Sequence, residues 1–107
     1  MADMVDDGIT GWGGDVKVNF FATFRPIVGG KTVEVDVVEG ATLQQLLKTL
    51  VARFPPIGPE LFDQDGNLRG HVHVFVNGRD SAYLAEQLGT RIKTQDVINI
   101  FPPVGGG

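Results

Sequence analysis

The sequence predicts an α+β fold in which a mixed, four- to five-stranded sheet packs on one main helix. Two alternating segments lie close together in the first part of the chain, a single apolar stripe with helical spacing follows, and two further strand-like segments come after it. The chain has 107 residues, of which 42% are hydrophobic. A chain of this size and composition is expected to form one domain around one core.

The first two strands are predicted from alternation. Over residues 16–24 and 31–38, apolar side chains recur at every second position, which is the period of a strand with one buried face. The side chains expected to point inward are Val16, Val18, Phe20, Ala22, Phe24, Val33, Val35 and Val37. Pro26 and Gly29-Gly30 supply the turn between the strands. Two strands so close in the chain form an antiparallel hairpin.

A helix is predicted next. Thr42 and Gln45 have the spacing of a capping box, in which each side chain accepts a hydrogen bond from an N–H at the helix start. Apolar residues then fall on one stripe: Leu43, Leu46, Leu47, Leu50, Val51 and Phe54. Pro55-Pro56 ends the helix because proline cannot continue it. We expect this helix to form the centre of the core.

Residues 55–70 are predicted to be a loop with short elements, with a tight turn at Asp65-Gly66. A third strand is expected over residues 72–76, with Val72, Val74 and Val76 on its inward face. The Asn77-Gly78 pair that follows is typical of a tight turn.

Residues 80–94 look irregular, with one helical turn expected near residues 83–88. The last strand covers residues 96–101, and its inward face is ambiguous because Ile98 and Ile100 compete with Val97 and Phe101. The order strand, strand, helix, strand, strand describes a β-grasp, or ubiquitin-like, roll, although other small α+β folds share it.

The chain is therefore divided into a flexible N-terminal extension (residues 1–14), a β-grasp domain (residues 15–101) and an extended tail (residues 102–107). Within the extension, which is acidic and rich in glycine, Trp12 either packs on the domain or stays loose.

Composition excludes several classes of function. The formal net charge is −4 and no basic cluster is present, which argues against nucleic acid as a partner and permits a partner with a basic surface. Without cysteine, the chain can form no disulfide, no thiolate-ligated metal site and no catalytic thiol. No apolar run is long enough to cross a membrane and no signal peptide is evident, so the expected location is the cytoplasm.

No active site or metal site is predicted. His71 and His73 are two apart on a predicted strand and could share a metal, but they lack a third ligand, so a polar outward face is the better interpretation. Asp63 and Asp65 resemble only a fragment of a calcium loop, and a turn explains them better. With no Ser, His and Asp grouping, the chain is expected not to be an enzyme.

The tail is the most informative segment. Residues 102–107 read PPVGGG and directly follow the last predicted strand. Prolines favour a stiff extended path, whereas glycines have no side chain to block close approach. The pattern predicts a short stalk that carries a thin arm ending in a main-chain carboxylate, suited to a narrow channel in another protein. The alternative is a tail without a role.

Four segments carry a resemblance to a known family. They are residues 100–107 (IFPPVGGG), 74–79 (VFVNGR), 17–22 (KVNFFA) and the loop 61–66 (LFDQDG). Together they resemble the MoaD/ThiS family of ubiquitin-like sulfur carriers, and most of all its MoaD-like branch and the related archaeal small modifier proteins. The chain departs from the family twice. It has Gln95-Asp96 where a Gly-Asp turn is usual, and three final glycines where two are typical.

The resemblance implies a mechanism. An E1-like adenylating enzyme would use ATP and Mg²⁺ to activate the carboxylate of Gly107, which Gly106 precedes. A sulfurtransferase would then supply sulfur to give a thiocarboxylate, which is used in molybdopterin biosynthesis by the large subunit of a synthase. The chain itself would bind no cofactor. In the alternative, the activated Gly107 is conjugated to lysines of target proteins, as in a protein modifier. A plain interaction module with an inert tail is the third interpretation.

The resemblance also implies a docking surface. Phe21 lies on the polar side of the first strand, and Phe101 precedes the prolines. An exposed aromatic ring on a small domain is a candidate anchor for a partner. The alternative is that these rings cover the sheet edge or pack under residues 80–88. The partner-binding residues expected are Phe21, Phe101, Pro102, Pro103, Val104 and Gly105.

Overall fold

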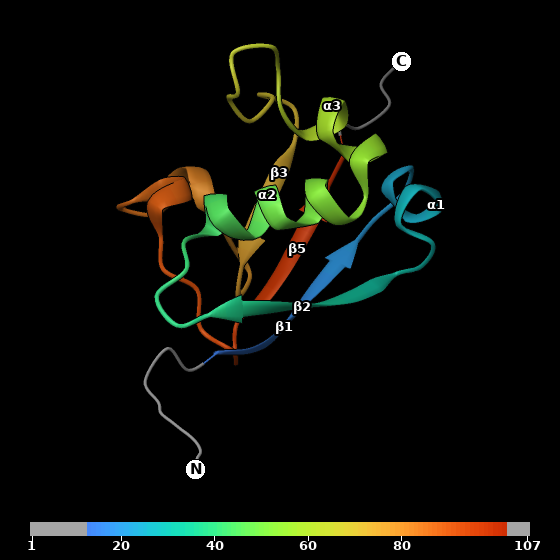
Figure 1. The fold of residues 1–107 in the computed structure, drawn as a ribbon. Helices are drawn as coiled ribbons and strands as arrows, with labels where there is room; N and C mark the ends of the chain where they lie inside the picture. The colour runs from blue at the N-terminus through green and yellow to red at the C-terminus, as the bar shows by residue number, and fades with distance from the viewer. Residues whose placement is uncertain (1–12, 103–107) are drawn as a thin grey trace.

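A computed structural model describes residues 13–102 of the chain. Five strands form one sheet in the order β2-β1-β5-β3-β4, with β5 parallel to β1 and the other neighbours antiparallel (Figure 1). The strands are β1 (Gly13–Phe20), β2 (Thr32–Val38), β3 (His73–Val76), β4 (Arg79–Asp80) and β5 (Val97–Phe101). The helices are α1 (Phe24–Val28), α2 (Leu43–Arg53) and α3 (Gly58–Leu61). This is a β-grasp fold, which confirms the predicted fold class.

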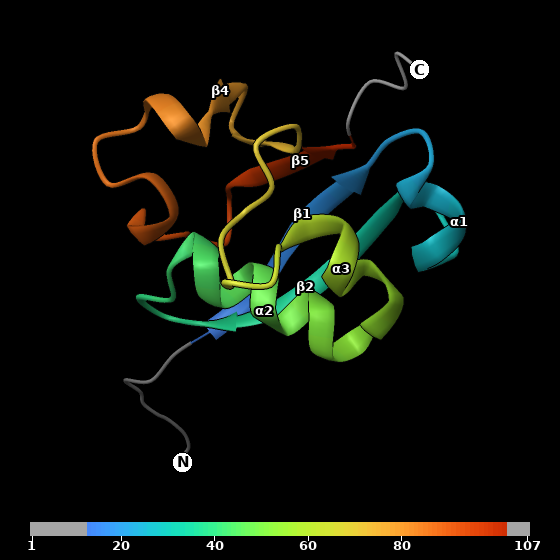
Figure 2. The same ribbon diagram turned by 90° about the horizontal axis from the view of Figure 1, so that it is seen from above.

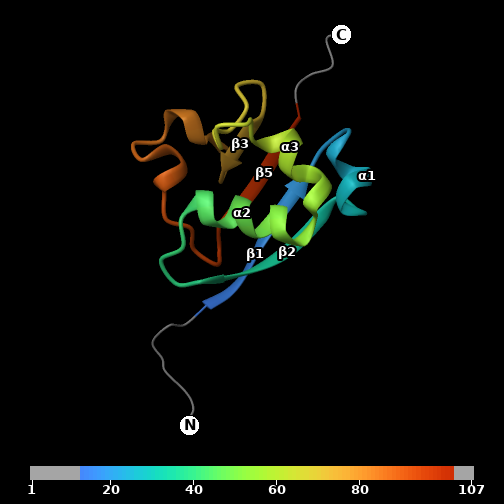
Figure 3. The same ribbon diagram turned by 45° about the horizontal axis from the view of Figure 1, so that its top comes forward.

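The helices α2 and α3 cover one face of the sheet (Figures 2 and 3). Between them and the sheet lies the core, to which α2 contributes Leu43, Leu46, Leu47 and Leu50, none of them exposed to solvent. From Val16 onward every second residue of β1 is buried, and so is every second residue of β2, as the alternation predicts. The structure also resolves the ambiguous face of β5, because Ile98 and Ile100 are fully buried and Phe101 is only half-buried.

The capping box at the start of α2 is confirmed. The backbone N–H of Gln45 donates to Thr42 Oγ1 over 3.2 Å, and the N–H of Thr42 donates to Gln45 Oε1 over 2.8 Å. The helix ends at Arg53, and a 3₁₀ turn (η1, Pro55–Ile57) follows directly. Val51 and Phe54 are only partly buried, so the buried stripe is narrower than predicted.

The first strand differs from its predicted bounds at both ends. Gly13 and Gly14 pair with Val38 and Val37, so the strand begins before residue 15. It ends at Phe20, where the sequence predicted strand up to residue 24. Ala22 is exposed, contrary to prediction, and adopts a left-handed φ of 52°, which breaks the alternation.

The segment predicted as strand end and turn forms the short helix α1. Pro26 lies in its first turn, where the missing N–H of proline costs no hydrogen bond. Phe24 is buried as predicted, but it reaches the core from a helix instead of a strand.

Two predicted turns are confirmed. In the loop after α3, Gly66 has φ of 82°, and the carboxylate of Asp63 accepts the N–H groups of Asp65 and Asn67 over 2.9 and 3.0 Å. Between β3 and β4, Asn77 and Gly78 have φ values of 51° and 85°, as a tight hairpin turn requires.

The stretch before β5 holds two short 3₁₀ turns, η2 (Ser81–Tyr83) and η3 (Gln87–Gly89), where one helical turn was predicted. The backbone φ of Gln95 is not positive, so this residue adds no backbone strain at the position where the family usually has glycine. Instead, Asp96 fixes the turn by accepting the N–H of Lys93 over 2.8 Å and the side-chain amide of Asn77 over 2.9 Å. None of the helices within residues 13–102 has the length and apolar character needed to span a membrane.

Candidate functional site

The structure describes the base of the predicted arm. The arm follows β5, which lies between β1 and β3 and is therefore held by hydrogen bonds on both sides up to Phe101. Pro102 is buried. The remaining tail residues of the prediction lie outside the described residues: Pro103, Val104, Gly105, Gly106 and Gly107.

Three phenylalanines gather on the open face of the sheet beside this base. The rings of Phe21 and Phe101 stack with centroids 4.2 Å apart and planes 14° from parallel. Phe75 meets Phe101 edge-on, with centroids 5.3 Å apart. We call Phe21, Phe75 and Phe101 the aromatic cluster. All three are half-buried, so the domain exposes part of each aromatic ring beside the point where its arm begins.

The strand register explains why these residues meet. In the parallel pairing of β1 with β5, Phe20 lies opposite Ile100, and both point into the core. Phe101, the next residue of β5, and Phe21, which directly follows the end of β1, therefore lie together on the opposite face. Phe75 lies between the buried Val74 and Val76 on β3, so it shares that face. The alternative had either ring covering the sheet edge or packing under residues 80–88, whereas in the structure the two rings stack on each other.

Arg25 supports the cluster from α1. Its Nε donates a hydrogen bond to the carbonyl oxygen of Phe20 over 2.8 Å, and its guanidinium carbon lies 5.4 Å from the centre of the Phe21 ring. A guanidinium at this distance is attracted by the face of the ring. Phe21 therefore interacts with both a cation and a second aromatic ring.

A polar row borders the cluster on the same face. The side-chain amide of Asn19 donates to Asn99 Oδ1 over 2.8 Å, and the hydroxyl of Thr32 donates to Asn19 Oδ1 over 2.8 Å. These bonds tie the open faces of β1, β2 and β5 together. An apolar patch with a polar border is the usual anatomy of a protein–protein contact.

The two histidines do not form a metal site within residues 13–102. His73 Nδ1 lies 3.0 Å from Asp80 Oδ2 across the β3–β4 hairpin. His71 lies in the turn before β3, so the expectation that it shares a strand face with His73 was wrong. Among residues 13–102 no three potential ligands from His, Asp or Glu cluster as a metal would need.

Sequence reasoning named Phe21 and Phe101 but missed Phe75 and Arg25. The signal for Phe75 was present, since it alternates with the inward Val74 and Val76. Arg25 could not be found in this way, because it lies on a helix where the sequence predicted a turn.

The comparison with family models decides the family. The model described as the ThiS family matches residues 18–107, most of the chain. The chain belongs to the ThiS family. Among curated proteins, this ThiS family member is 36% identical over 93 residues to small archaeal modifier protein 3 of Haloferax volcanii, covering 87% of this chain and 99% of the relative. It is 35% identical over 75 residues to a candidate sulfur carrier protein of Archaeoglobus fulgidus, covering 70% of this chain and 83% of that protein.

Solved structures of ThiS-like proteins share the fold. The crystal structure of small archaeal modifier protein 1 from Haloferax volcanii has a TM-score of 0.77 at 35% identity, covering 88% of this chain and 100% of that one. A candidate subunit 1 of molybdopterin converting factor from Pyrococcus furiosus has a TM-score of 0.68 at 33% identity, and the match covers 85% of this chain and 99% of that one. The structure of the Amycolatopsis orientalis BexX/CysO complex has a TM-score of 0.71 at 29% identity, and the match covers 86% of this chain and 99% of the matched chain. The family thus includes small modifiers and sulfur carriers.

Proposed function

We propose that this chain is a ubiquitin-like sulfur carrier whose terminal glycine, Gly107, is adenylated and converted to a thiocarboxylate, and that the sulfur serves molybdopterin biosynthesis in the cytoplasm. The observation that carries the proposal is the continuity between the central strand β5 and the glycine tail. Because β5 is bonded on both sides, it offers a fixed base from which residues 103–107 can be inserted into a partner.

The chemistry needs help from a partner. A carboxylate is a poor electrophile until one of its oxygens is joined to a group that turns it into a good leaving group. In the proposed first step the Gly107 carboxylate attacks the α-phosphorus of ATP, which releases pyrophosphate and leaves an acyl adenylate. An E1-like adenylating enzyme would supply ATP, Mg²⁺ and the groups that position them. The proposed docking surface for this enzyme is the aromatic cluster; Pro102, expected from the sequence to contact the partner, is buried and serves as the base of the arm.

In the second step a sulfur nucleophile attacks the carbonyl carbon of Gly107, a C–S bond forms and AMP leaves. When the donor is a persulfide on a sulfurtransferase, a thiol then cleaves the S–S bond and leaves the thiocarboxylate. The large subunit of a molybdopterin synthase would accept this sulfur. The likeness to the candidate molybdopterin converting factor subunit of Pyrococcus furiosus supports this acceptor.

A second function has support of equal weight. The small archaeal modifier proteins among the relatives favour conjugation of Gly107 to target proteins. In that reaction a lysine amine, not sulfide, displaces the leaving group and an amide forms. Both functions begin with the same activated glycine, so they differ only in the nucleophile that is presented to it.

Mass spectrometry tests the proposal. We would incubate the chain with ATP, Mg²⁺, an E1-like enzyme of the same organism and a persulfide-loaded sulfurtransferase, and then measure its intact mass. A sulfur carrier gains the difference between one sulfur and one oxygen atom. With proteins of the host added, a modifier instead forms conjugates in which the C-terminal peptide of this chain, residues 94–107 after cleavage at Lys93, is attached through Gly107 to their lysines.

The control is a chain that lacks Gly106 and Gly107, so that it no longer ends in two glycines; both residues lie outside the domain of residues 13–102, and their removal should leave the circular dichroism unchanged. Full activation of this shortened chain would refute both functions together.

A further inference from the structure

The outer edge of β2 presents backbone hydrogen-bonding groups to which no other strand is paired. Within residues 13–102, β2 is an outermost strand of the sheet and pairs only with β1 (Figure 3). Trp12 and the residues before it lie outside this range. A free edge of this kind is a place where an extended segment of another chain can join the sheet.

The register of the β1–β2 pair shows which backbone groups point outward. The N–H of Phe20 donates to the carbonyl oxygen of Lys31 over 2.7 Å, so these two opposite residues form a bonded pair. In an antiparallel ladder, bonded pairs alternate with pairs that are not bonded. The residues of β2 bonded to β1 are therefore Val33, Val35 and Val37. The residues whose N–H and C=O groups point away from β1 are Thr32, Glu34, Asp36 and Val38.

Two of the outward carbonyl groups already have partners. Arg53 Nη1 donates to the carbonyl oxygen of Glu34 over 2.8 Å, and the N–H of Ala41 donates to that of Val38 over 3.1 Å. Between these contacts lies an open stretch, residues 34–38. Its outward groups without a hydrogen-bond partner among residues 13–102 are the N–H groups of Glu34, Asp36 and Val38 and the carbonyl group of Asp36.

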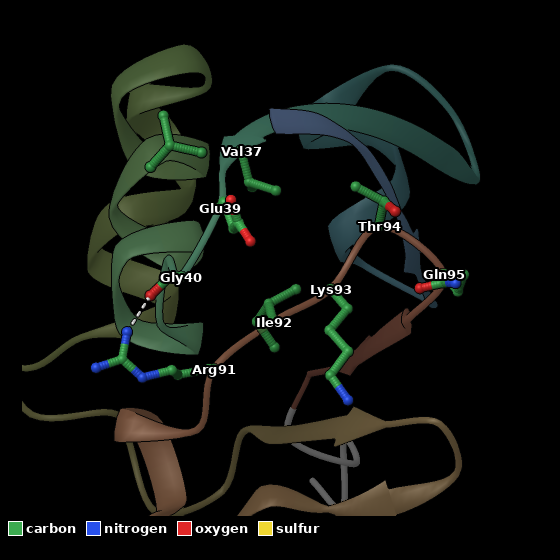
Figure 4. A pocket seen from close by; sticks show the side chains of 9 residues that line it. Val37, Glu39, Gly40, Arg91, Ile92, Lys93, Thr94 and Gln95 are labelled. Atoms are coloured by element: carbon green, nitrogen blue, oxygen red, sulfur yellow. Dashed lines mark hydrogen bonds between the residues drawn. The ribbon is translucent and has the colours of Figure 1, made fainter. Parts of the chain in front are cut away.

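The open stretch is held at both ends. Arg53 fixes it at Glu34, and the turn that follows Val38 fixes the other end. In this turn the guanidinium of Arg91 donates to the carbonyl oxygen of Gly40 over 2.8 Å (Figure 4). Because the stretch is already an ordered strand, a segment that pairs with it does not bear the cost of ordering β2.

The side chains beside this edge are acidic. Glu34 and Asp36 are exposed on the open face, because buried and exposed residues alternate along β2. Asp36 lies opposite Asp15 of β1 in a pair that is not bonded, where side chains are closest. Like charges directly opposite each other destabilise a sheet. Within residues 13–102, no lysine or arginine forms an ion pair with either aspartate, so a cation from another molecule would relieve the repulsion.

A second copy of this chain fits the edge poorly. Antiparallel pairing of the whole stretch 34–38 with itself would set Asp36 opposite Asp36, which adds a further like-charge pair. A segment with lysine or arginine at every second position would instead place its cations on the open face, beside Glu34 and Asp36. The charge of the edge therefore selects a basic segment of a different protein.

We propose that the outer edge of β2 binds an extended, lysine- or arginine-rich segment of a partner protein, which pairs antiparallel with residues 34–38 as an additional strand. One residue of this segment exchanges both backbone hydrogen bonds with Asp36, and its side chain then lies beside the Asp36 carboxylate. The aromatic cluster lies on the far side of β1, so the edge can hold a segment while the docking surface stays accessible. The site does not depend on activation of Gly107.

A nuclear magnetic resonance titration tests the site with a peptide in which lysine and threonine alternate. At low salt, we expect the amide protons of Glu34, Asp36 and Val38 to shift and to exchange with solvent more slowly. A peptide with glutamate in place of lysine should not bind. If the lysine peptide leaves the exchange of these three amide protons unchanged, the proposal is wrong.

Methylation of the peptide backbone isolates the pairing without changing the chain. In the proposed arrangement the N–H groups of the lysines face β2, and those of the threonines face away. Methylation of the lysine N–H groups should therefore weaken binding about tenfold or more, whereas methylation of the threonine N–H groups should leave it nearly unchanged. Equal binding of the two methylated peptides would overturn the proposal.

A pair of variants gives the same test from the other side. Asp36→Ala and Asp36→Pro both remove the carboxylate, but only proline also removes the outward N–H. Proline is tolerated at this position because the N–H does not bond to β1, and circular dichroism checks the fold. We expect Asp36→Pro to bind the lysine peptide about tenfold more weakly than Asp36→Ala. If light scattering detects dimers of the chain that the peptide dissociates, the edge binds a second copy and the proposal is wrong.

Discussion

Replacing Phe21 with alanine tests the docking surface most directly. The ring stacks on Phe101 at 4.2 Å, a contact worth about 0.5–1.5 kcal/mol beyond area burial. Arg25 adds about 0.5–1 kcal/mol from its position over the ring. Because Phe21 is half-buried and outside the core, the expected loss of folding free energy is about 1–3 kcal/mol, and the domain stays folded.

The effect on partner binding should be larger than that modest loss suggests. An aromatic anchor in a protein interface contributes at least about 2 kcal/mol, which is about a 30-fold change in the dissociation constant. We therefore expect Phe21→Ala to raise the KM of the adenylating enzyme for this chain about 30-fold. The kcat should change little, because residues 103–107 are intact and bind the same catalytic groups.

The assay is pyrophosphate release at increasing concentrations of the chain, with circular dichroism to confirm folding. Val38→Ala is the control, since Val38 is also an exposed apolar side chain, 64% exposed, at the other end of the sheet. Phe101→Ala, alone and combined with Phe21→Ala, completes a double-mutant cycle that should be non-additive because the rings touch. A folded Phe21→Ala chain with an unchanged KM would refute the docking surface.

Three further predictions concern the fold. Leu46→Ala, at a fully buried position of α2, should lower the free energy of unfolding by about 2–5 kcal/mol in guanidinium titrations; a loss below that range would mean that the core closes around the gap. Thr42→Ala should cost about 1 kcal/mol through loss of the capping box, and Thr42→Asn should restore most of it; equal stability of the two variants would contradict the capping role. Gly78→Ala should lower the free energy of unfolding by about 1–2 kcal/mol, because the φ of Gly78 is +85°. Gly30→Ala should be neutral, because Gly30 has no positive φ and an added methyl group would meet open space. The same shift in melting temperature for both variants would argue against backbone strain at Gly78.

The sequence predicted those elements in which one period dominates. In β2 the inward valines alternate with charged or polar residues, and in α2 the leucines keep helical spacing behind a clear cap. In β5 both faces are apolar, so the period alone could not choose between Ile98 and Val97. Which face of β5 is buried depends on the neighbouring strands, because β5 is the central strand of the sheet and carries the aromatic cluster on its other face.

The left-handed turn at Ala22 could not be foreseen. Alanine has no preference for positive φ, and the apolar alternation continues through Phe24 as if the strand went on. The fold overrides this local pattern, since Phe24 gains the same burial from α1. The contact between Phe21 and Phe101 was equally hidden, because it requires the parallel pairing of β1 with β5, which only the complete topology determines.

The position of β5 has a consequence for the newly made protein. This strand follows every other described element in the chain, yet it joins the β1–β2 hairpin to the β3–β4 hairpin. During synthesis the two hairpins emerge first and cannot be connected until residues 97–101 are also available. The segment that completes the sheet is the one that leads into the glycines, so a chain that presents residues 103–107 has already made every strand of the sheet.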